Sequence, residues 1–191
     1  GTPIKKLFLD SREPHQNQNI YNYRARKYNK WIQQDYLVVD NDAIIDTFKS
    51  AFPQQHTKVL SAGYPRVRYL LDKQHDLPYQ NFIKKELRLN HDKPTLLYAP
   101  TWKTKAEDLL PISDGLLNKY NVIYKAHNED RNAFKPDNAI IAPDHIETQD
   151  LILVSDVVLT DYSSIIYDAI TVDKIVCQYT PNHERYVSER G

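Results

Sequence analysis

The stretch that decides the fold lies near the end of the chain and reads Ser155-Asp156-Val157-Val158-Leu159-Thr160-Asp161-Tyr162-Ser163-Ser164. Its apolar run ends in turn-forming residues, and two serines then open a run with helical spacing of apolar residues. The stretch predicts a buried strand at 156–160 and a helix at 163–170. A helix start carries free N–H groups and the positive end of the helix dipole, so it suits an anion. The alternative is that Ser163 only caps the helix, because serine is a favoured cap.

The same alternation of strand and helix extends to both sides of this stretch. We expect strands at 95–99, 121–125, 139–142 and 174–177, with helices at 112–119 and 149–155. Near-continuous apolar strands that alternate with helices indicate a parallel sheet covered on both faces, and hence an α/β fold.

The first third of the chain predicts part of another α/β unit. A strand is expected at 35–40, a helix at 43–49, and a second strand from residue 59 that runs into a turn at 63–66. A basic amphipathic helix at 81–89 then leads into the regular pattern. We therefore predict a partial first domain at 1–66 and a second, Rossmann-like domain at 67–191.

Composition excludes several classes of protein. No run of about 18 apolar residues is present to span a bilayer, and the single cysteine, Cys177, excludes a disulfide framework and a cysteine-based zinc site. With no signal peptide in the sequence, we expect a reducing cytosol. The 191 residues include no methionine, so we expect a fragment that lacks its start and is truncated in its second domain.

Charge is balanced overall but unevenly distributed. Residues 1–135 hold 22 Lys and Arg against 15 Asp and Glu, whereas residues 136–191 hold 3 against 10. The basic part suggests an anionic partner, and the neutral total gives no reason to expect nucleic acid. Cations and aromatics interleave at 21–31, which indicates either contact with phosphates or a membrane surface, or a solvated helix.

Candidate site residues follow the predicted strands, because ligands of an open parallel sheet bind beyond the carboxyl ends of its strands. His127 suits a general base or a donor to a phosphoryl oxygen, and Lys125 suits a point charge on phosphate. The alternative for His127 is an ordinary loop histidine. Arg66 either reaches a phosphate or belongs only to its turn. The remaining candidates at the strand ends are Thr101, Trp102, Thr160, Asp161, Ser163 and Ser164.

Three familiar kinds of site are not indicated. Only 4 glycines are present, and neither a dinucleotide fingerprint nor a Walker A loop occurs. No two histidines are three or four residues apart, so we expect no metal site. No Gly-x-Ser-x-Gly elbow of a hydrolase is found.

Several motifs together resemble one family, the CDP-glycerol:poly(glycerophosphate) glycerophosphotransferases of teichoic acid synthesis. The blocks occur in family order across essentially the whole chain: Gly1-Thr2-Pro3-Ile4-Lys5-Lys6-Leu7, Gly63-Tyr64-Pro65-Arg66, Leu97-Tyr98-Ala99-Pro100-Thr101-Trp102, Lys125-Ala126-His127, the stretch 155–164, and Tyr167-Asp168. The stretch 155–164 is highly specific for this family, whereas the Lys-x-His step alone is only weak evidence for it.

The resemblance implies a GT-B-like arrangement, with an acceptor-side first domain and donor binding mainly by the second. It implies that His127 contacts the transferred phosphate or assists proton transfer, and that Thr160, Ser163 and Ser164 lie near the pyrophosphate. It also implies transfer of a polyol phosphate from CDP-glycerol or CDP-ribitol, used as substrates without a cofactor, to a lipid-linked anionic polyol-phosphate chain. The expected location is cytoplasmic, with peripheral contact at the inner face of the membrane.

Departures from the family pattern leave two alternatives open. Val67-Arg68 follows the Gly-Tyr-Pro-Arg turn where relatives carry Asn-Asp, Asn128 follows His127 where many carry proline, and Tyr167 with Ala169-Ile170 replaces a more aromatic run. One alternative is a GT-B glycosyltransferase that uses a nucleotide sugar for a capsule or wall polymer. The other is a non-catalytic remnant, because the family's other functional histidine would precede Gly1.

Overall fold

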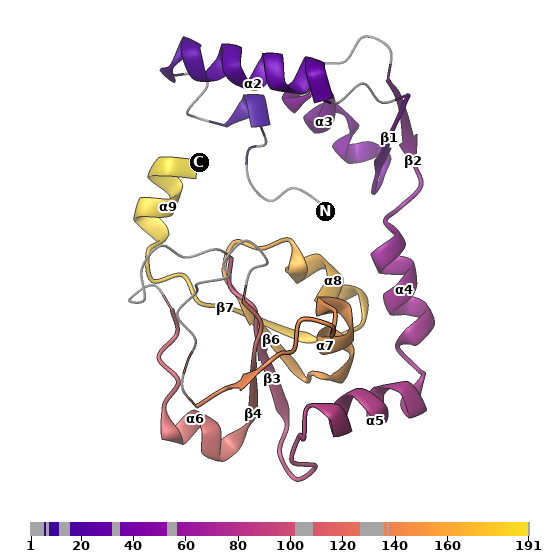
Figure 1. Ribbon diagram of the computed structural model, residues 1–191, viewed down its shortest axis with the longest axis vertical. Helices are drawn as coiled ribbons and strands as arrows, with labels where there is room; N and C mark the ends of the chain where they lie inside the picture. The colour runs from indigo at the N-terminus through magenta and orange to yellow at the C-terminus, as the bar shows by residue number, and fades with distance from the viewer. Residues whose placement is uncertain are drawn as a thin grey trace. The chain divides into compact units, whose positions relative to one another are not determined.

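The computed structural model describes residues 6, 8–11, 16–31, 35–52, 57–101, 109–126, 136 and 138–190. These residues cluster into two compact units, one of residues 1–65 with 182–191 and one of residues 66–181, whose elements Figure 1 labels. The boundary of functional domains that the sequence predicts between residues 66 and 67 stays a prediction.

A parallel sheet forms the centre of the unit 66–181, and among the described residues its strand order is β5-β4-β3-β6-β7. Every neighbouring pair is parallel, and Leu97 of β3 lies opposite both Ile123 of β4 and Val158 of β6. Parallel neighbours require a crossover connection, and α6 lies between β3 and β4 in the sequence, α7 between β5 and β6, and α8 between β6 and β7. The predicted α/β class and Rossmann-like parallel sheet are therefore confirmed. The strands are β3 (Thr95–Tyr98), β4 (Asn121–Tyr124), β5 (Ile140–Ile141), β6 (Val157–Thr160) and β7 (Ile175–Gln178).

Both faces of this sheet are covered by helices. One face packs with α4 (Pro65–Lys73), α5 (Leu77–Glu86), α7 (Thr148–Val154) and α8 (Ile165–Thr171) around Leu97, Ile123 and Val158. The other face packs with α6 (Asp114–Lys119) around Leu96 and Tyr98. Side chains alternate between the faces of a strand, so strands buried on both sides must be apolar throughout. That requirement explains why β3 and β4 are buried at every position.

The other unit contains a smaller parallel pair, in which Val38 of β1 (Tyr36–Val39) lies opposite Leu60 of β2 (Lys58–Ser61). Its helices in the described ranges are η1 (Phe8–Asp10), α2 (Gln18–Trp31), η2 (Asp42–Ile44), α3 (Ile45–Ala51) and α9 (His183–Arg190). The rings of Phe8 and Phe48 each stack with Phe52. The predicted α/β character of the first third is confirmed by this strand–helix–strand unit.

Helix α4 is the main difference between the predicted and the observed elements. The sequence predicts only a turn at 63–66, but Pro65 begins a helix that continues to Lys73. Proline suits the first turn of a helix, because its fixed φ matches the helix and its missing N–H needs no partner there. Gly63 provides the turn itself, with φ of +71°, in the left-handed region that favours glycine.

The start of helix α5 also differs from the prediction. Helix α5 begins at Leu77 rather than at residue 81, because the Asp76 carboxylate caps it by accepting a hydrogen bond of 3.1 Å from the Tyr79 N–H. The interleaved stretch 21–31 lies within α2, where Tyr23 is 62% exposed, which agrees with the solvated helix that the sequence offers as one alternative. Its contact with phosphates or a membrane stays a prediction.

Within the ranges that the structure describes, no helix is both long and apolar enough to cross a membrane.

Candidate functional site

The ends of β3 and β6 are joined by the first pair of predicted site residues. The Asp161 carboxylate accepts two hydrogen bonds from Thr101, at 3.0 Å from its backbone N–H and at 2.7 Å from its hydroxyl. Asp161 is buried, with 1% of its surface exposed, so these bonds have little competition from water. The carboxyl ends of adjacent strands therefore do converge at these residues, as the sequence predicts for an open parallel sheet.

Thr160 lies one residue earlier and is fully buried. Its hydroxyl donates a hydrogen bond of 2.6 Å to the carbonyl of Ala99, directly after β3. The side chain thus bridges β3 and β6 beneath the edge where a ligand is expected. Its predicted place near a pyrophosphate stays a prediction.

The start of α8 presents the two predicted serines. Ser164 is the N-cap residue, and its side chain makes no capping hydrogen bond. The Ser163 hydroxyl accepts a hydrogen bond from the Ile165 N–H at 3.4 Å, and the Ile166 N–H reaches the Ser163 carbonyl at 3.4 Å. Both distances are long for N–H···O bonds, so an anion is able to replace these weak partners.

Ser163 and Ser164 are also half-buried rather than covered. Next to them, burial raises the pKa of Tyr162 above its usual 10.0, and the nearby Asp161 charge raises it further against the lowering effect of a hydrogen bond with Thr180. Tyr162 therefore keeps its proton at neutral pH and adds no negative charge to the start of α8.

Arg66 is brought to the same helix from a distant part of the sequence. Its Nε–H donates a hydrogen bond of 2.8 Å to Oδ1 of Asp168, which lies on α8. The Asp168 side chain is 7% exposed and that of Arg66 is 29% exposed. Because Ser164 and Asp168 are four residues apart, they lie on one face of α8, and the guanidinium lies about one helical turn from the helix start.

Lys125 follows β4 as predicted, but its ammonium has protein partners. It donates to the carbonyl of Ile146 at 3.1 Å and to that of Pro143 at 3.5 Å. These bonds tie the end of β4 to the loop before α7. The predicted role of Lys125 as a point charge on phosphate stays a prediction. His127 and Trp102, the other two candidates, lie outside the described residues.

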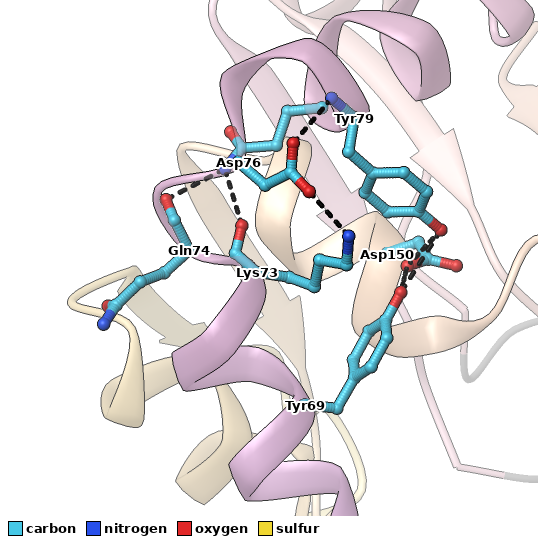
Figure 2. Close-up of polar contacts among 7 residues, drawn as sticks. Tyr69, Lys73, Gln74, Asp76, Tyr79 and Asp150 are labelled. Atoms are coloured by element: carbon cyan, nitrogen blue, oxygen red, sulfur yellow. Dashed lines mark hydrogen bonds and ion pairs between the residues drawn. The ribbon is translucent and has the colours of Figure 1, made fainter.

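Asp168, a buried carboxylate, was predicted only as part of a family motif and not as a site residue, and a separate polar cluster around Asp150 was not predicted. Asp168 interrupts an apolar helix, and a carboxylate in such a place needs a partner, which is the signal that was available. In the cluster, Oδ1 of Asp150 accepts hydrogen bonds from the hydroxyls of Tyr69 and Tyr79 (Figure 2). No signal pointed to this cluster, because its members are 71 and 81 residues apart from Asp150 in the sequence.

The described residues together can bind an anion at the carboxyl edge of the sheet. The start of α8 provides N–H groups and hydroxyls, and Arg66 provides a positive charge beside it. Within the described ranges no group of three or more His, Cys, Asp or Glu side chains is placed to hold a metal ion.

Comparisons with known proteins identify relatives of this chain. A relative from Bacillus spizizenii, a teichoic acid poly(glycerol phosphate) polymerase, is 31% identical over 97% of this chain and 51% of its own length. The solved structure of the wall teichoic acid polymerase TagF superposes with a TM-score of 0.79 at 28% identity, over 97% of this chain and 49% of that one. A variant of TagF soaked with CDPG superposes with a TM-score of 0.76 at 28% identity, over 98% and 48% of the two chains.

The chain thus spans about half the length of the relatives that it matches. The likeness to TagF confirms the predicted α/β, GT-B-like fold class. The model of one family, CDP-Glycerol:Poly(glycerophosphate) glycerophosphotransferase, matches residues 1–191. The resemblance that the sequence motifs indicated is confirmed, and this chain belongs to the CDP-glycerol:poly(glycerophosphate) glycerophosphotransferase family.

Proposed function

We propose that this chain provides the donor site of a teichoic acid glycerophosphotransferase. In the proposed reaction, an acceptor hydroxyl oxygen attacks the glycerol-bearing phosphorus of CDP-glycerol and forms the new P–O bond. The bond from that phosphorus to the bridging oxygen breaks, CMP leaves with the electron pair, and the hydroxyl proton passes to a base. The product is an acceptor chain longer by one glycerol phosphate.

The observation that carries this proposal is the pairing of Arg66 with α8 at the carboxyl edge of the sheet. A pyrophosphate donor needs cations and N–H donors that are already in place where negative charge grows on the leaving phosphate. The long hydrogen bonds at the start of α8 and the guanidinium one turn away meet that need. Family membership and the likeness to a polymerase soaked with CDPG support the cytidine donor.

The remaining partners follow from the same proposal. The acceptor is a lipid-linked polyol-phosphate chain, whose charge suits the excess of Lys and Arg in residues 1–135. Such an acceptor places the enzyme in the cytoplasm with peripheral contact at the inner face of the membrane. His127 is proposed to assist proton transfer, and no cofactor is required, because positioning and charge stabilisation are enough for phosphoryl transfer.

A competition experiment tests the class of donor. CDP-glycerol is titrated into the chain by calorimetry, alone and in the presence of CMP, CDP-ribitol or UDP-glucose. We expect CDP-glycerol and CMP to compete for one site and UDP-glucose to leave the titration unchanged. Preference for CDP-ribitol would indicate that the transferred group is ribitol phosphate. Preference for UDP-glucose would indicate the alternative of a nucleotide-sugar glycosyltransferase. No binding of any nucleotide would contradict the proposal.

A further inference from the structure

Arg66 contacts a buried carboxylate from a distant part of the sequence. The contact joins its Nε to Oδ1 of Asp168 at 2.8 Å, and the two residues are 102 positions apart in the sequence. Asp168 as a whole is 5% exposed. A buried carboxylate is costly unless a cation accompanies it, so Asp168 restricts Arg66 to the conformations that keep this contact. The Arg66 side chain remains 29% exposed, so a ligand can reach it.

A comparison within α4 shows that this contact is unlike an ordinary surface pair. Arg68 also uses its Nε, to contact Oδ2 of Asp72 at 3.0 Å, but those side chains are 79% and 55% exposed. A pair of that kind has little effect on stability or on side-chain position. The two arginines therefore make the same chemical contact in opposite environments.

The backbone that carries Arg66 is held at a second point. Three residues further along α4, the Tyr69 hydroxyl donates to Oδ1 of Asp150 at 2.6 Å, and the Tyr79 hydroxyl reaches the same oxygen at 3.1 Å (Figure 2). Asp150 is 6% exposed and belongs to α7. Helix α4 is thus attached to α7 through Tyr69 and to α8 through Arg66. This double attachment fixes where the Arg66 guanidinium lies relative to the start of α8.

We propose that Asp168 is a positioning residue for donor binding, which acts by holding Arg66 beside the start of α8 where the donor pyrophosphate is bound. This inference rests on the proposed function and adds a residue to it. Asp168 itself does not touch the donor. Its effect is to keep the arginine in its binding conformation before the donor arrives, so that less conformational freedom is lost on binding.

The test is a double-mutant cycle on the affinity for CDP-glycerol, measured by calorimetry with the variants Asp168→Asn, Arg66→Ala and both together. Asp168→Asn is expected to weaken binding about tenfold, the scale of one charge-assisted contact. In the Arg66→Ala background, Asp168→Asn is expected to have no further effect on affinity, because the residue through which it acts is gone. Asp72→Asn is the matched control and is expected to bind like the wild type.

Stability is measured on the same variants by urea unfolding, because a merely structural residue would change stability in both backgrounds without this pattern in affinity. If Asp168→Asn does not fold, Arg66→Lys replaces it, since lysine keeps the charge but lacks the fork that contacts Asp168 and phosphate together. Arg66→Lys is then expected to bind about tenfold more weakly.

The possible outcomes separate this inference from the proposed function. Wild-type affinity in Asp168→Asn, or in Arg66→Lys if that variant is used, would overturn the inference and leave the donor site intact. Equal weakening by Asp168→Asn with and without Arg66 would also overturn it. Failure of the wild type itself to bind CDP-glycerol would overturn the proposed function, and this inference with it.

Discussion

At the scale of single residues, the candidate site depends on buried carboxylates whose partners come from other strands and helices. Asp161, directly after β6, contacts Thr101 beyond the end of β3, Asp168 joins α8 to α4, and Asp150 joins α7 to α4 and α5. Each has a relative exposure of at most 6%. Loss of one partner at such a position leaves a buried polar group without its hydrogen bond, which costs more than the bond itself contributes.

The substitution Asp161→Asn tests the first of these carboxylates. An amide offers one oxygen in place of two, so the N–H and the hydroxyl of Thr101 can no longer each donate to a carboxylate oxygen, and the charge that strengthens both bonds is lost. We expect a loss of about 1–3 kcal/mol in the free energy of unfolding, measured with urea. Asp92→Asn, at an exposed position, is the control and is expected to unfold like the wild type. Equal stability of the two variants would contradict the account.

The Tyr69 hydroxyl leads to a prediction about alkaline pH. Burial raises the pKa of Tyr69 far above its usual 10.0, and its hydrogen bonds to Asp150 and Tyr79 raise it further. Above about pH 10, the unfolded chain releases this proton and the folded chain keeps it, so the folded state binds more protons and stability falls as pH rises. Below about pH 10 the stabilising contribution of this hydroxyl is complete.

Tyr69→Phe is therefore expected to be less stable than the wild type at neutral pH but to lose less stability between about pH 9 and about pH 11. Unfolding in urea at several pH values measures both effects. Tyr23→Phe, on the exposed surface of α2, is the control and is expected to unfold like the wild type at neutral pH. A parallel pH dependence for Tyr69→Phe and the wild type would show that the hydroxyl is not held as described.

At the scale of elements, α4 connects the Gly63 turn to α8. Gly63 adopts a positive φ in this turn. Gly115 instead lies in the first turn of α6, where a Cβ added to it would contact only Ser113 Oγ, at an ordinary distance of 3.8 Å. These two glycines therefore differ in conformation and not in crowding, since nothing lies within 4 Å of a Cβ added at Gly63.

Alanine at these two glycines is expected to have opposite effects. Gly63→Ala should destabilise by about 1 kcal/mol, because an alanine in the left-handed region is strained. Gly115→Ala should stabilise by roughly 0.5 kcal/mol, because it reduces the freedom of the unfolded chain. Melting temperatures from circular dichroism measure both changes. A stabilising effect of Gly63→Ala would contradict the assigned φ of Gly63, and a destabilising effect of Gly115→Ala would contradict the account of Gly115.

The elements differ in how far the sequence predicts them, for physical reasons. Strands β3 and β4 are predictable because both of their faces are buried, which leaves apolar runs that are not typical of loops. Helix α4 was not predicted because residues 63–66 are typical of a turn, although a proline there also suits the first position of a helix. The strand-end candidates Thr101 and Asp161 do meet, because strand topology alone brings them together. The Arg66–Asp168 pair depends on helix packing across 102 positions, which local patterns do not encode.

At the scale of the whole molecule, donor binding is proposed to use groups that the chain itself provides. The proposed site combines a guanidinium, backbone N–H groups and two serine hydroxyls at the carboxyl edge of the sheet in the unit 66–181. Positive charge for the pyrophosphate comes from Arg66 in this account, without a divalent cation.

Removal of metal ions should therefore leave donor binding unchanged. CDP-glycerol is titrated into the chain before and after treatment with EDTA, and the two dissociation constants are expected to agree within about twofold, well below the tenfold that one charge-assisted contact contributes. A loss of affinity that added Mg²⁺ restores would contradict donor binding by protein groups alone.

Donor binding at the start of α8 is tested by the affinity for CDP-glycerol of the double variant Ser163→Ala/Ser164→Ala. Ser113→Ala is the matched control, because Ser113 begins another helix, α6, by accepting a hydrogen bond from the Leu116 N–H at 3.3 Å. The account predicts binding at least about tenfold weaker in the double variant and unchanged binding in Ser113→Ala. Wild-type affinity in the double variant would contradict the claim and would show that these serines only form the start of the helix.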